Sequence, residues 1–229
     1  MQRKASRAET VGYWTNGNGL RSPVRGATSA DRRAPAPVLR CLIVSANDSA
    51  RERLVAELRE HALVVGEVTL TSGRTAPYYV DAKRAILRPA GFHALGELVA
   101  AAARARAASA VGGMTMGADP VACAALAAGA DVTAFFVRKD RKAHGLQRWV
   151  EGPPLAPGER CLIVEDVVTT GGSTVAAVER VREEGLEVVG VLSVLDRLAG
   201  GAVAIEAAAG APYEALTTID DVYPERPDR

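Results

Sequence analysis

The fold of this chain is decided by CLIVEDVVTTGGSTVAAVERVREEG, residues 161–185. Its first four residues are apolar and predict a buried strand, and two acidic residues, Glu165 and Asp166, follow them. A loop of threonine, glycine and serine comes next and leads into a segment with helical periodicity that ends at Gly185. A buried strand that passes through a short loop into a helix is the repeating unit of a parallel α/β sheet.

Strands and helices alternate along the rest of the chain as well. Further strands are expected at 77–83, 108–114, 131–139, 186–197 and 213–220, and further helices at 50–63, 92–109, 119–130 and 202–210. The apolar runs 161–164 and 188–195 are typical of central parallel strands that are buried on both faces. Because ligands bind beyond the carboxyl ends of such strands, we expect the chemistry in the loops after Val111, Val137, Val164 and Leu195.

The charge is unevenly distributed along the chain. The whole chain carries a net charge of +1, but residues 1–40 hold eight basic and two acidic residues and so carry +6, which leaves −5 for 41–229. Residues 1–48 are rich in arginine, glycine, alanine and proline and show no periodic pattern, so we expect a disordered basic extension. An organelle transit peptide and a wrongly chosen start codon are the alternatives for this segment. The folded domain is expected at 49–229, with Asn47, Asp48 and Ser49 capping its first helix.

Composition excludes several classes of protein. Three isolated cysteines without a CxxC spacing argue against a disulfide scaffold and a cysteine-based zinc site, and they favour a reducing compartment, the cytoplasm. No run of about 18 apolar residues predicts a membrane-spanning helix. The balanced charge argues against a protein that coats nucleic acid.

Residues 169–174, TTGGST, predict a site for a monophosphate. Glycines let the backbone close around an anion, hydroxyls donate hydrogen bonds, and the helix N-terminus contributes N–H groups and partial positive charge. The loop lacks both GxxxxGK[ST] and GxGxxG, so it is neither a Walker loop nor a dinucleotide fingerprint. The acidic pair before it suits two sugar hydroxyls or a divalent cation, and a phosphate beside a diol describes a ribose 5-phosphate. An ordinary capped helix after a strand is the alternative.

This segment resembles the phosphoribosyl pyrophosphate (PRPP) signature of type I phosphoribosyltransferases. The resemblance implies that family's fold: α/β, with a central, mostly parallel sheet flanked by helices, a small hood and a mobile catalytic loop. It also implies that Glu165 and Asp166 contact the ribose hydroxyls and that the following residues hold PRPP and its 5′-phosphate, namely Val167, Val168, Thr169, Thr170, Gly171, Gly172 and Ser173. Many members have two aspartates at the acidic pair, and Glu165 is a departure that keeps the charge.

A second signal is RKDRKAHG, residues 138–145, directly after an apolar strand. A solvated charged turn is the plain interpretation, but four cations at the ligand edge of the sheet could neutralise a leaving pyrophosphate. The stretch is similar to the catalytic loop of orotate phosphoribosyltransferases, and the matching residues are Arg138, Lys139, Lys142, His144 and Gly145. In that family the loop reaches into the partner subunit's site, which implies a homodimer with shared active sites.

Two further segments carry the same resemblance. Residues 66–87 resemble the segment that flanks the pyrimidine, with matches at Ser72, Gly73, Tyr79 and Val80. Many members have lysines at the positions of Thr71 and Met116, and this chain lacks both. In LDR, residues 195–197, the resemblance assigns Arg197 and Thr169 to the orotate carboxylate.

The resemblance covers roughly residues 50–222 and implies the synthesis of orotidine 5′-monophosphate and pyrophosphate from orotate and PRPP, a step of pyrimidine biosynthesis. The catalytic residues it implies are Lys142, His144, Arg138 and Asp166, with Mg²⁺ as cofactor, held mainly by PRPP rather than by protein ligands. A phosphoribosyltransferase for a purine or another base is the first alternative, and a PRPP-sensing regulator that contacts RNA is the second. Fusion to the next enzyme of the pathway is not expected, because 229 residues leave no room for a second barrel.

Overall fold

The computed structural model describes residues 37–69, 75–140 and 148–229, with the side chains of 47–68, 75–140 and 148–229. Within Pro37–Arg229, six strands form one sheet in the order β5-β4-β3-β6-β7-β8, and two more form a separate antiparallel pair, β1-β2. The strands of the large sheet are β3 (Ala110–Met114), β4 (Thr133–Val137), β5 (Val150–Glu151), β6 (Arg160–Val168), β7 (Glu187–Asp196) and β8 (Tyr213–Thr218). All neighbours in it are parallel except β4 and β5, so the predicted mostly parallel sheet is confirmed.

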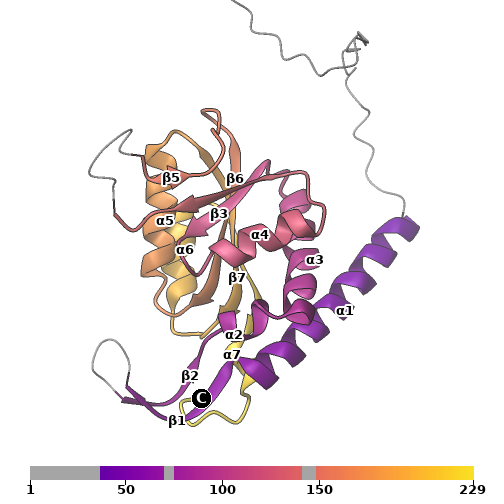
Figure 1. The fold of residues 1–229 in the computed structure, drawn as a ribbon, viewed down its shortest axis with the longest axis vertical. Helices are drawn as coiled ribbons and strands as arrows, with labels where there is room; N and C mark the ends of the chain where they lie inside the picture. Colours follow the sequence, from indigo (N-terminus) through magenta and orange to yellow (C-terminus); the bar gives the residue numbers. More distant parts are fainter. Residues whose placement is uncertain (1–36, 70–74, 141–147) are drawn as a thin grey trace, which may run out of the picture. The chain divides into compact units, whose positions relative to one another are not determined.

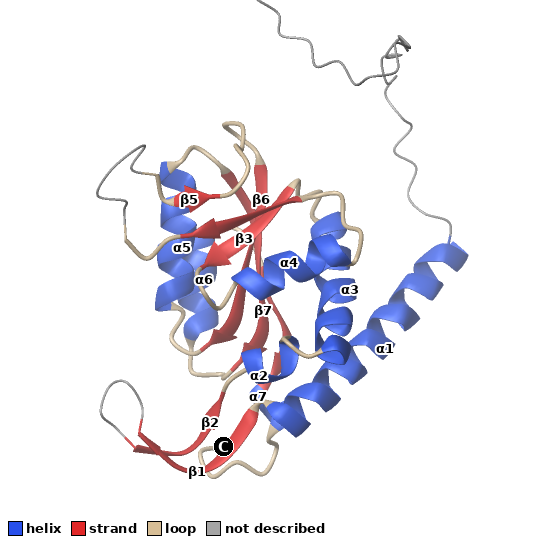
Figure 2. Ribbon diagram, in the orientation of Figure 1, coloured by secondary structure: helices blue, strands red, loops and turns tan. Residues whose placement is uncertain are grey.

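Helices cover both faces of this sheet (Figures 1 and 2). One face carries α5 (Gly172–Glu183) and α6 (Gly201–Ala209), and the other carries α1 (Pro37–His61), α3 (Pro89–Ala105) and α4 (Asp119–Ala127). Among the described residues, no helix combines the length and the apolar character needed to cross a membrane. With helices on both faces of the sheet, the layered α/β architecture expected from the sequence is present.

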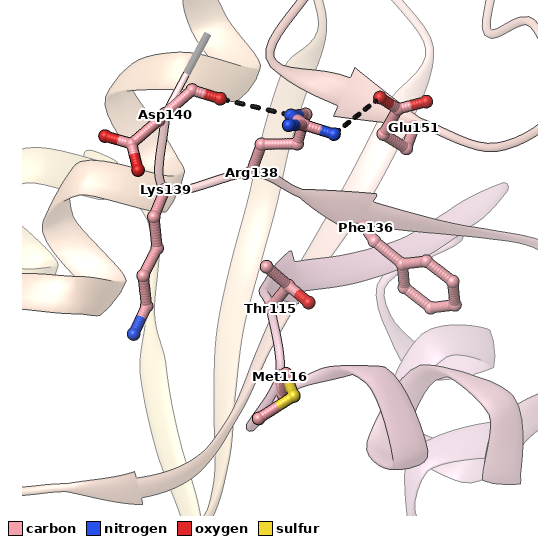
Figure 3. A pocket seen from close by; sticks show the side chains of 7 residues that line it. All are labelled: Thr115, Met116, Phe136, Arg138, Lys139, Asp140 and Glu151. Atoms are coloured by element: carbon pink, nitrogen blue, oxygen red, sulfur yellow. Dashed lines mark hydrogen bonds and ion pairs between the residues drawn. The ribbon is translucent and has the colours of Figure 1, made fainter. Parts of the chain in front are cut away.

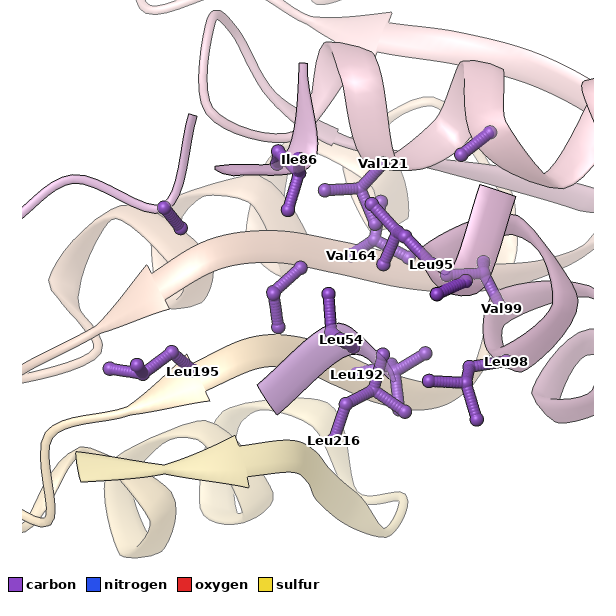
Figure 4. Packing of buried hydrophobic residues seen from close by; sticks show 14 of the residues in the cluster. Leu54, Ile86, Leu95, Leu98, Val99, Val121, Val164, Leu192, Leu195 and Leu216 are labelled. Atoms are coloured by element: carbon purple, nitrogen blue, oxygen red, sulfur yellow. The ribbon is translucent and has the colours of Figure 1, made fainter. Parts of the chain in front are cut away.

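The central strands are buried on both faces because their side chains alternate between two hydrophobic clusters. Leu162 and Val164 of β6 pack with α1, α3 and α4, whereas Cys161 and Ile163 of the same strand pack with α5 and α6. Figure 4 shows Val164 in the first cluster beside residues of β7, α1 and α3. Burial on both sides explains why this strand reads as a continuous apolar run.

A crevice opens between β3 and β6 at the carboxyl end of the sheet. The two strands pair only from Ala110 with Cys161 to Gly112 with Ile163, whereas β6 continues beside β7 as far as Val168 with Asp196. The chain also changes direction here, since β4 lies on one side of β3 while β7 and β8 lie beyond β6. Ligands bind at such a switch point in open α/β sheets.

The antiparallel pair β1 (Leu63–Thr69) and β2 (Thr75–Val80) lies apart from the large sheet (Figure 1) and is the part of the fold that fits a small hood. The short helix α2 (Lys83–Ile86) follows it. The C-terminal segment after α7 (Ile219–Val222) packs against β2, with the rings of Tyr78 and Tyr223 edge to face at 5.4 Å.

The first helix begins earlier than the predicted residue 50. α1 begins at Pro37, so Asn47, Asp48 and Ser49 lie inside the helix rather than capping it. Asp48 and Ser49 are exposed there and need no local partner, and proline fits the first helical position. The rest of the expected extension, residues 1–36, lies outside the described residues, and its disorder stays a prediction.

Three short elements were not predicted, namely β5, α2 and α7, and β1 was expected only as part of an extended and turning stretch at 64–73. Each of the three short elements has two or four residues, too few for a periodic pattern. The last of them begins at Ile219, where the sequence predicted that the final strand continues. There Thr218 and Asp221 form a capping box and turn the chain into a helix.

Candidate active site

The two acidic side chains lie buried in the last part of β6. Glu165 is 4% exposed and Asp166 is 8% exposed. Ser173 Oγ donates to Glu165 Oε2 at 2.9 Å and Thr174 Oγ1 donates to the same oxygen at 3.3 Å, which ties the acid to the start of α5. The strand extends to Val168 and so brings both carboxylates to the crevice.

The loop after β3 closes over these acids. A Cβ atom at Gly117 would lie 2.3 Å from Asp166 Oδ1 and 2.9 Å from Glu165 Oε1, so only glycine allows the backbone this close. Asp166 Oδ1 also accepts a hydrogen bond from the Val167 amide at 2.8 Å. The remaining oxygen, Asp166 Oδ2, accepts one from Lys83 Nζ at 2.8 Å.

The predicted phosphate loop turns tightly between β6 and α5. Gly171 has φ +81°, a left-handed conformation, and it lies against Gly201 and Ile205 at the start of α6. Thr169, Thr170, Gly172 and Ser173 are exposed around it. The first N–H groups of α5 point out of the helix at this loop, which is the arrangement that binds an anion.

Two neighbouring cavities lie at the carboxyl ends of β3, β4 and β6, and the smaller one adjoins the acids. One, of about 260 Å³, is lined by Lys83, Met114–Gly117, Lys139, Glu165–Val167 and Ser173. The other, of about 410 Å³, is lined by Thr115, Met116, Phe136, Arg138–Asp140 and Glu151 and is shown in Figure 3. They share Thr115, Met116 and Lys139, so they lie next to each other, and the lining of each holds both cations and carboxylates.

The described ends of the predicted catalytic loop are firmly held. The Arg138 amide donates to the Trp149 carbonyl at 2.9 Å, and Arg180 of α5 donates to the Arg138 carbonyl at 2.9 Å. The Arg180 guanidinium also lies 4.4 Å from the centre of the Trp149 ring. Arg138 forms an ion pair with Glu151 at 3.2 Å (Figure 3). The loop therefore leaves and rejoins the sheet at a fixed place beside the cavities.

Arg197 lies where β7 ends. Its amide donates to the Val168 carbonyl at 2.9 Å, which places it next to the phosphate loop. Its guanidinium lies 5.1 Å from the centre of the Tyr78 ring, and its buried Nε has no hydrogen-bond partner within the described part of the chain. A buried, unsatisfied guanidinium N–H is costly and suits an anionic ligand.

The two residues predicted to flank the pyrimidine, Tyr79 and Val80, do not both offer a side chain to a ligand. Tyr79 is 39% exposed, whereas the Val80 side chain is buried in the core, so only the backbone of Val80 is available to a ligand. Because side chains alternate along β2, Tyr78 rather than Tyr79 meets Arg197. Ser72, Gly73, Lys142, His144 and Gly145 lie outside the described residues, so their roles stay predictions.

The pKa of Glu165 is raised to about 7, chiefly because burial disfavours the charged form and secondly because Asp166 is adjacent. A carboxyl group whose pKa is raised on folding stabilises the folded state at acid pH, and this contribution is lost as pH rises through about 7. Glutamine lacks this titration. We therefore expect the Tm of Glu165→Gln, relative to the Tm of the natural protein, to rise as the pH is raised from 4.5 to 8. Thermal unfolding of both proteins across this range measures it, and a constant difference in Tm would contradict the assignment.

One residue at the site was missed by the sequence analysis. Lys83 contacts Asp166 and also Asp81, at 3.0 Å, and it lines the smaller cavity. In the sequence it is an ordinary lysine after an expected strand, and only the fold brings it to the acids 83 positions away. Nothing in its local pattern signals this role.

Comparison with known proteins supports the resemblance. The phosphoribosyl transferase domain family matches residues 100–207, which hold the acidic pair, the phosphate loop and the basic loop. An orotate phosphoribosyltransferase of Corynebacterium glutamicum is 48% identical over 179 residues, which make up 78% of this chain and 96% of that protein.

Solved structures of the same enzyme also share the fold. The orotate phosphoribosyltransferase of Mycobacterium tuberculosis in complex with Fe(III) dicitrate superposes with a TM-score of 0.69 at 45% identity, covering 76% of this chain and 99% of that one. The same enzyme in complex with PRPP gives a TM-score of 0.65 at 41% identity, covering 76% and 98%.

Proposed function

This chain belongs to the orotate phosphoribosyltransferases and transfers the 5-phosphoribosyl group from PRPP to orotate, and we propose that the crevice between β3 and β6 is where it does so. Orotidine 5′-monophosphate and pyrophosphate are the products. The observation that carries the placement is the acidic pair, buried beside a glycine-rich turn at the switch point of the sheet. Residues 169–173 would hold the 5′-phosphate, and Glu165 and Asp166 the ribose hydroxyls.

Orotate would lie between Arg197 and the phosphate loop. The unpartnered Arg197 Nε and the neighbouring Thr169 offer donors to its carboxylate. The Tyr78 ring on the guanidinium restricts where that group can point. A purine has no carboxylate to satisfy this arginine, so the site favours orotate over a purine base.

Catalysis would come from charge stabilisation rather than from a protein nucleophile. As the bond from carbon 1 to pyrophosphate breaks, positive charge develops on the ribose and negative charge on the leaving group. Lys139 lines the cavity next to the acids and Arg138 lines the neighbouring larger one, so both can stabilise that negative charge. We assign Lys142 and His144 to the same group, His144 through a hydrogen bond or a proton.

The residues present fit a magnesium ion that arrives with PRPP. The acidic pair supplies two carboxylates beside the cavity in which the pyrophosphate would lie. Mg²⁺ commonly takes one or two carboxylates and completes its shell with substrate phosphates and water. When bound, the ion would add positive charge to the pyrophosphate oxygens.

We also propose a homodimer with shared sites. The support is the match of residues 138–145 to a loop that in this family reaches the partner subunit. If so, mixing Lys142→Ala with Asp166→Ala subunits is expected to restore activity, because a heterodimer holds one site in which neither residue is replaced. Purified heterodimers, verified by two different affinity tags, are assayed against each inactive parent, and no recovery above the parents would count against shared sites.

We place the enzyme in a reducing compartment, the cytoplasm. Cys123 and Cys161 are free, and burial raises the pKa of the Cys161 thiol to about 12, which keeps it unreactive.

The activity is tested by following the absorbance of orotate with PRPP and Mg²⁺. Adenine, hypoxanthine and uracil are run beside it as competing bases. Loss of orotate that depends on PRPP is expected. Turnover of a purine instead would support the purine alternative, and RNA binding without turnover of any base would support the regulator.

A further inference from the structure

Lys83 begins the short helix α2 and reaches the acidic pair from the hood side of the crevice. Its ammonium group lies 2.8 Å from Asp166 Oδ2 and 3.0 Å from Asp81 Oδ1. The side chain is still 37% exposed, because it faces the smaller cavity, together with Met116, Gly117 and Lys139. The lysine thus contacts a site carboxylate and the open space in which a ligand would bind.

The charge balance of this cavity calls for a cation that binds substrate. Two carboxylates line it, and the ligand proposed for it carries a pyrophosphate of several negative charges. The described cations that line it are Lys83 and Lys139. Met116, exposed at the position where related enzymes often have a lysine, supplies none. An anion beside Glu165 and Asp166 is therefore favoured only if nearby ammonium groups offset the repulsion.

Lys83 stays charged under all relevant conditions. Burial alone would lower its pKa, but hydrogen bonds and charges from Asp166 and Asp81 outweigh this and raise the pKa above its ordinary value. The group therefore carries three N–H donors, of which two are directed to these carboxylates.

The composition of the chain agrees with a specific role for this lysine. The sequence has 28 lysine and arginine residues in total. Only four of them are lysines, namely Lys4, Lys83, Lys139 and Lys142. In the described structure, arginine forms the surface ion pairs, such as Arg53 with Glu97 and Arg160 with Glu187. A compact ammonium on a flexible stem suits a phosphate in a confined cavity, whereas arginine serves where only an ion pair is needed.

We propose that Lys83 is a further substrate-binding residue, which contacts the pyrophosphate group of PRPP and of the released product. The pyrophosphate is attached to carbon 1, next to the hydroxyls assigned to the acidic pair, so it comes within reach of an ammonium already bound to Asp166. In the free enzyme Lys83 neutralises Asp166, and with substrate present its remaining donor binds a pyrophosphate oxygen. This inference rests on the proposed placement of PRPP.

The test is the binding of pyrophosphate and of PRPP by Lys83→Met, measured by isothermal titration calorimetry with Mg²⁺ present. Loss of a hydrogen bond between charged groups is expected to weaken both at least about tenfold, with the orotate KM changed less than about threefold. Lys83→Arg keeps the charge and should recover part of the affinity. Arg84→Met removes an exposed cation from the same helix and should bind as the natural enzyme does.

A purely structural role predicts something different. Lys83→Met would then lose thermal stability, as Asp81→Asn would, while the folded protein kept its affinity for pyrophosphate, and that result would overturn the proposal. Weaker PRPP binding with unchanged pyrophosphate binding would also overturn it, because it would assign Lys83 to the ribose.

A measurement on the natural enzyme applies even if the variant does not fold. With four lysines in the chain, the NMR signal of the Lys83 side chain can be assigned. It should shift on addition of pyrophosphate alone, and an unchanged signal at saturation contradicts the contact. If the natural enzyme consumed no orotate with PRPP, the proposed function would fail instead, whatever Lys83 does.

Discussion

Replacing Arg197 with alanine is expected to raise the KM for orotate by about 100-fold and the KM for PRPP far less. The loss corresponds to a pair of charge-assisted hydrogen bonds to a carboxylate in a partly buried place. Arg197 is positioned for this by its own amide, which is bound to Val168, and by the Tyr78 ring against its guanidinium. Steady-state kinetics with each substrate varied in turn measures both constants.

The control for this prediction is Arg197→Lys, which keeps the charge but loses the planar fork. It should recover only part of the orotate affinity, since a single ammonium cannot make two parallel bonds. Equal rises in both KM values for the alanine variant would mean that Arg197 supports the whole site rather than recognising the carboxylate.

Replacing Lys142 with alanine is expected to lower kcat by about two orders of magnitude or more, the scale of losing one transition-state donor. The unfolding temperature should stay unchanged. The described residues on either side support this assignment, because Arg138 and Trp149 fix both ends of the segment beside the cavities. Turnover of the purified variant, with its thermal unfolding as a folding control, measures the effect.

A matched control for Lys142 is Arg148→Ala. It removes an exposed cation from the end of the same stretch and should leave kcat within about twofold, as expected of a surface position. Unchanged turnover in the Lys142 variant would remove this lysine from the mechanism.

The parts of the fold that follow from the sequence are those with strong local patterns. The apolar run 161–164 and the acids after it predict a buried strand end, and the structure has both there. Helix boundaries were less accurate. α1 begins at Pro37 because neither proline nor glycine interrupts the helix after it, and Asp48 and Ser49 are tolerated inside the helix where they face solvent.

The parts of the site that the sequence does not predict are contacts between distant segments. Lys83 and Asp166 are 83 residues apart, and Tyr78 and Arg197 meet only because β2 lies beside the end of β7. The choice between Tyr78 and Tyr79 depends on which side of β2 faces the site, and a one-residue shift of a strand reverses that. The resemblance indicated the segment that holds both tyrosines, and the alternation of side chains along β2 shows that Tyr78 is the one that contacts Arg197.

A crystal structure of this enzyme with PRPP and Mg²⁺ tests the central claim most directly. We expect the 5′-phosphate on the N–H groups of residues 169–173 and the ribose hydroxyls on Glu165 and Asp166. PRPP bound elsewhere, with the turn at Gly171 empty and both carboxylates still in their present contacts, would contradict the account.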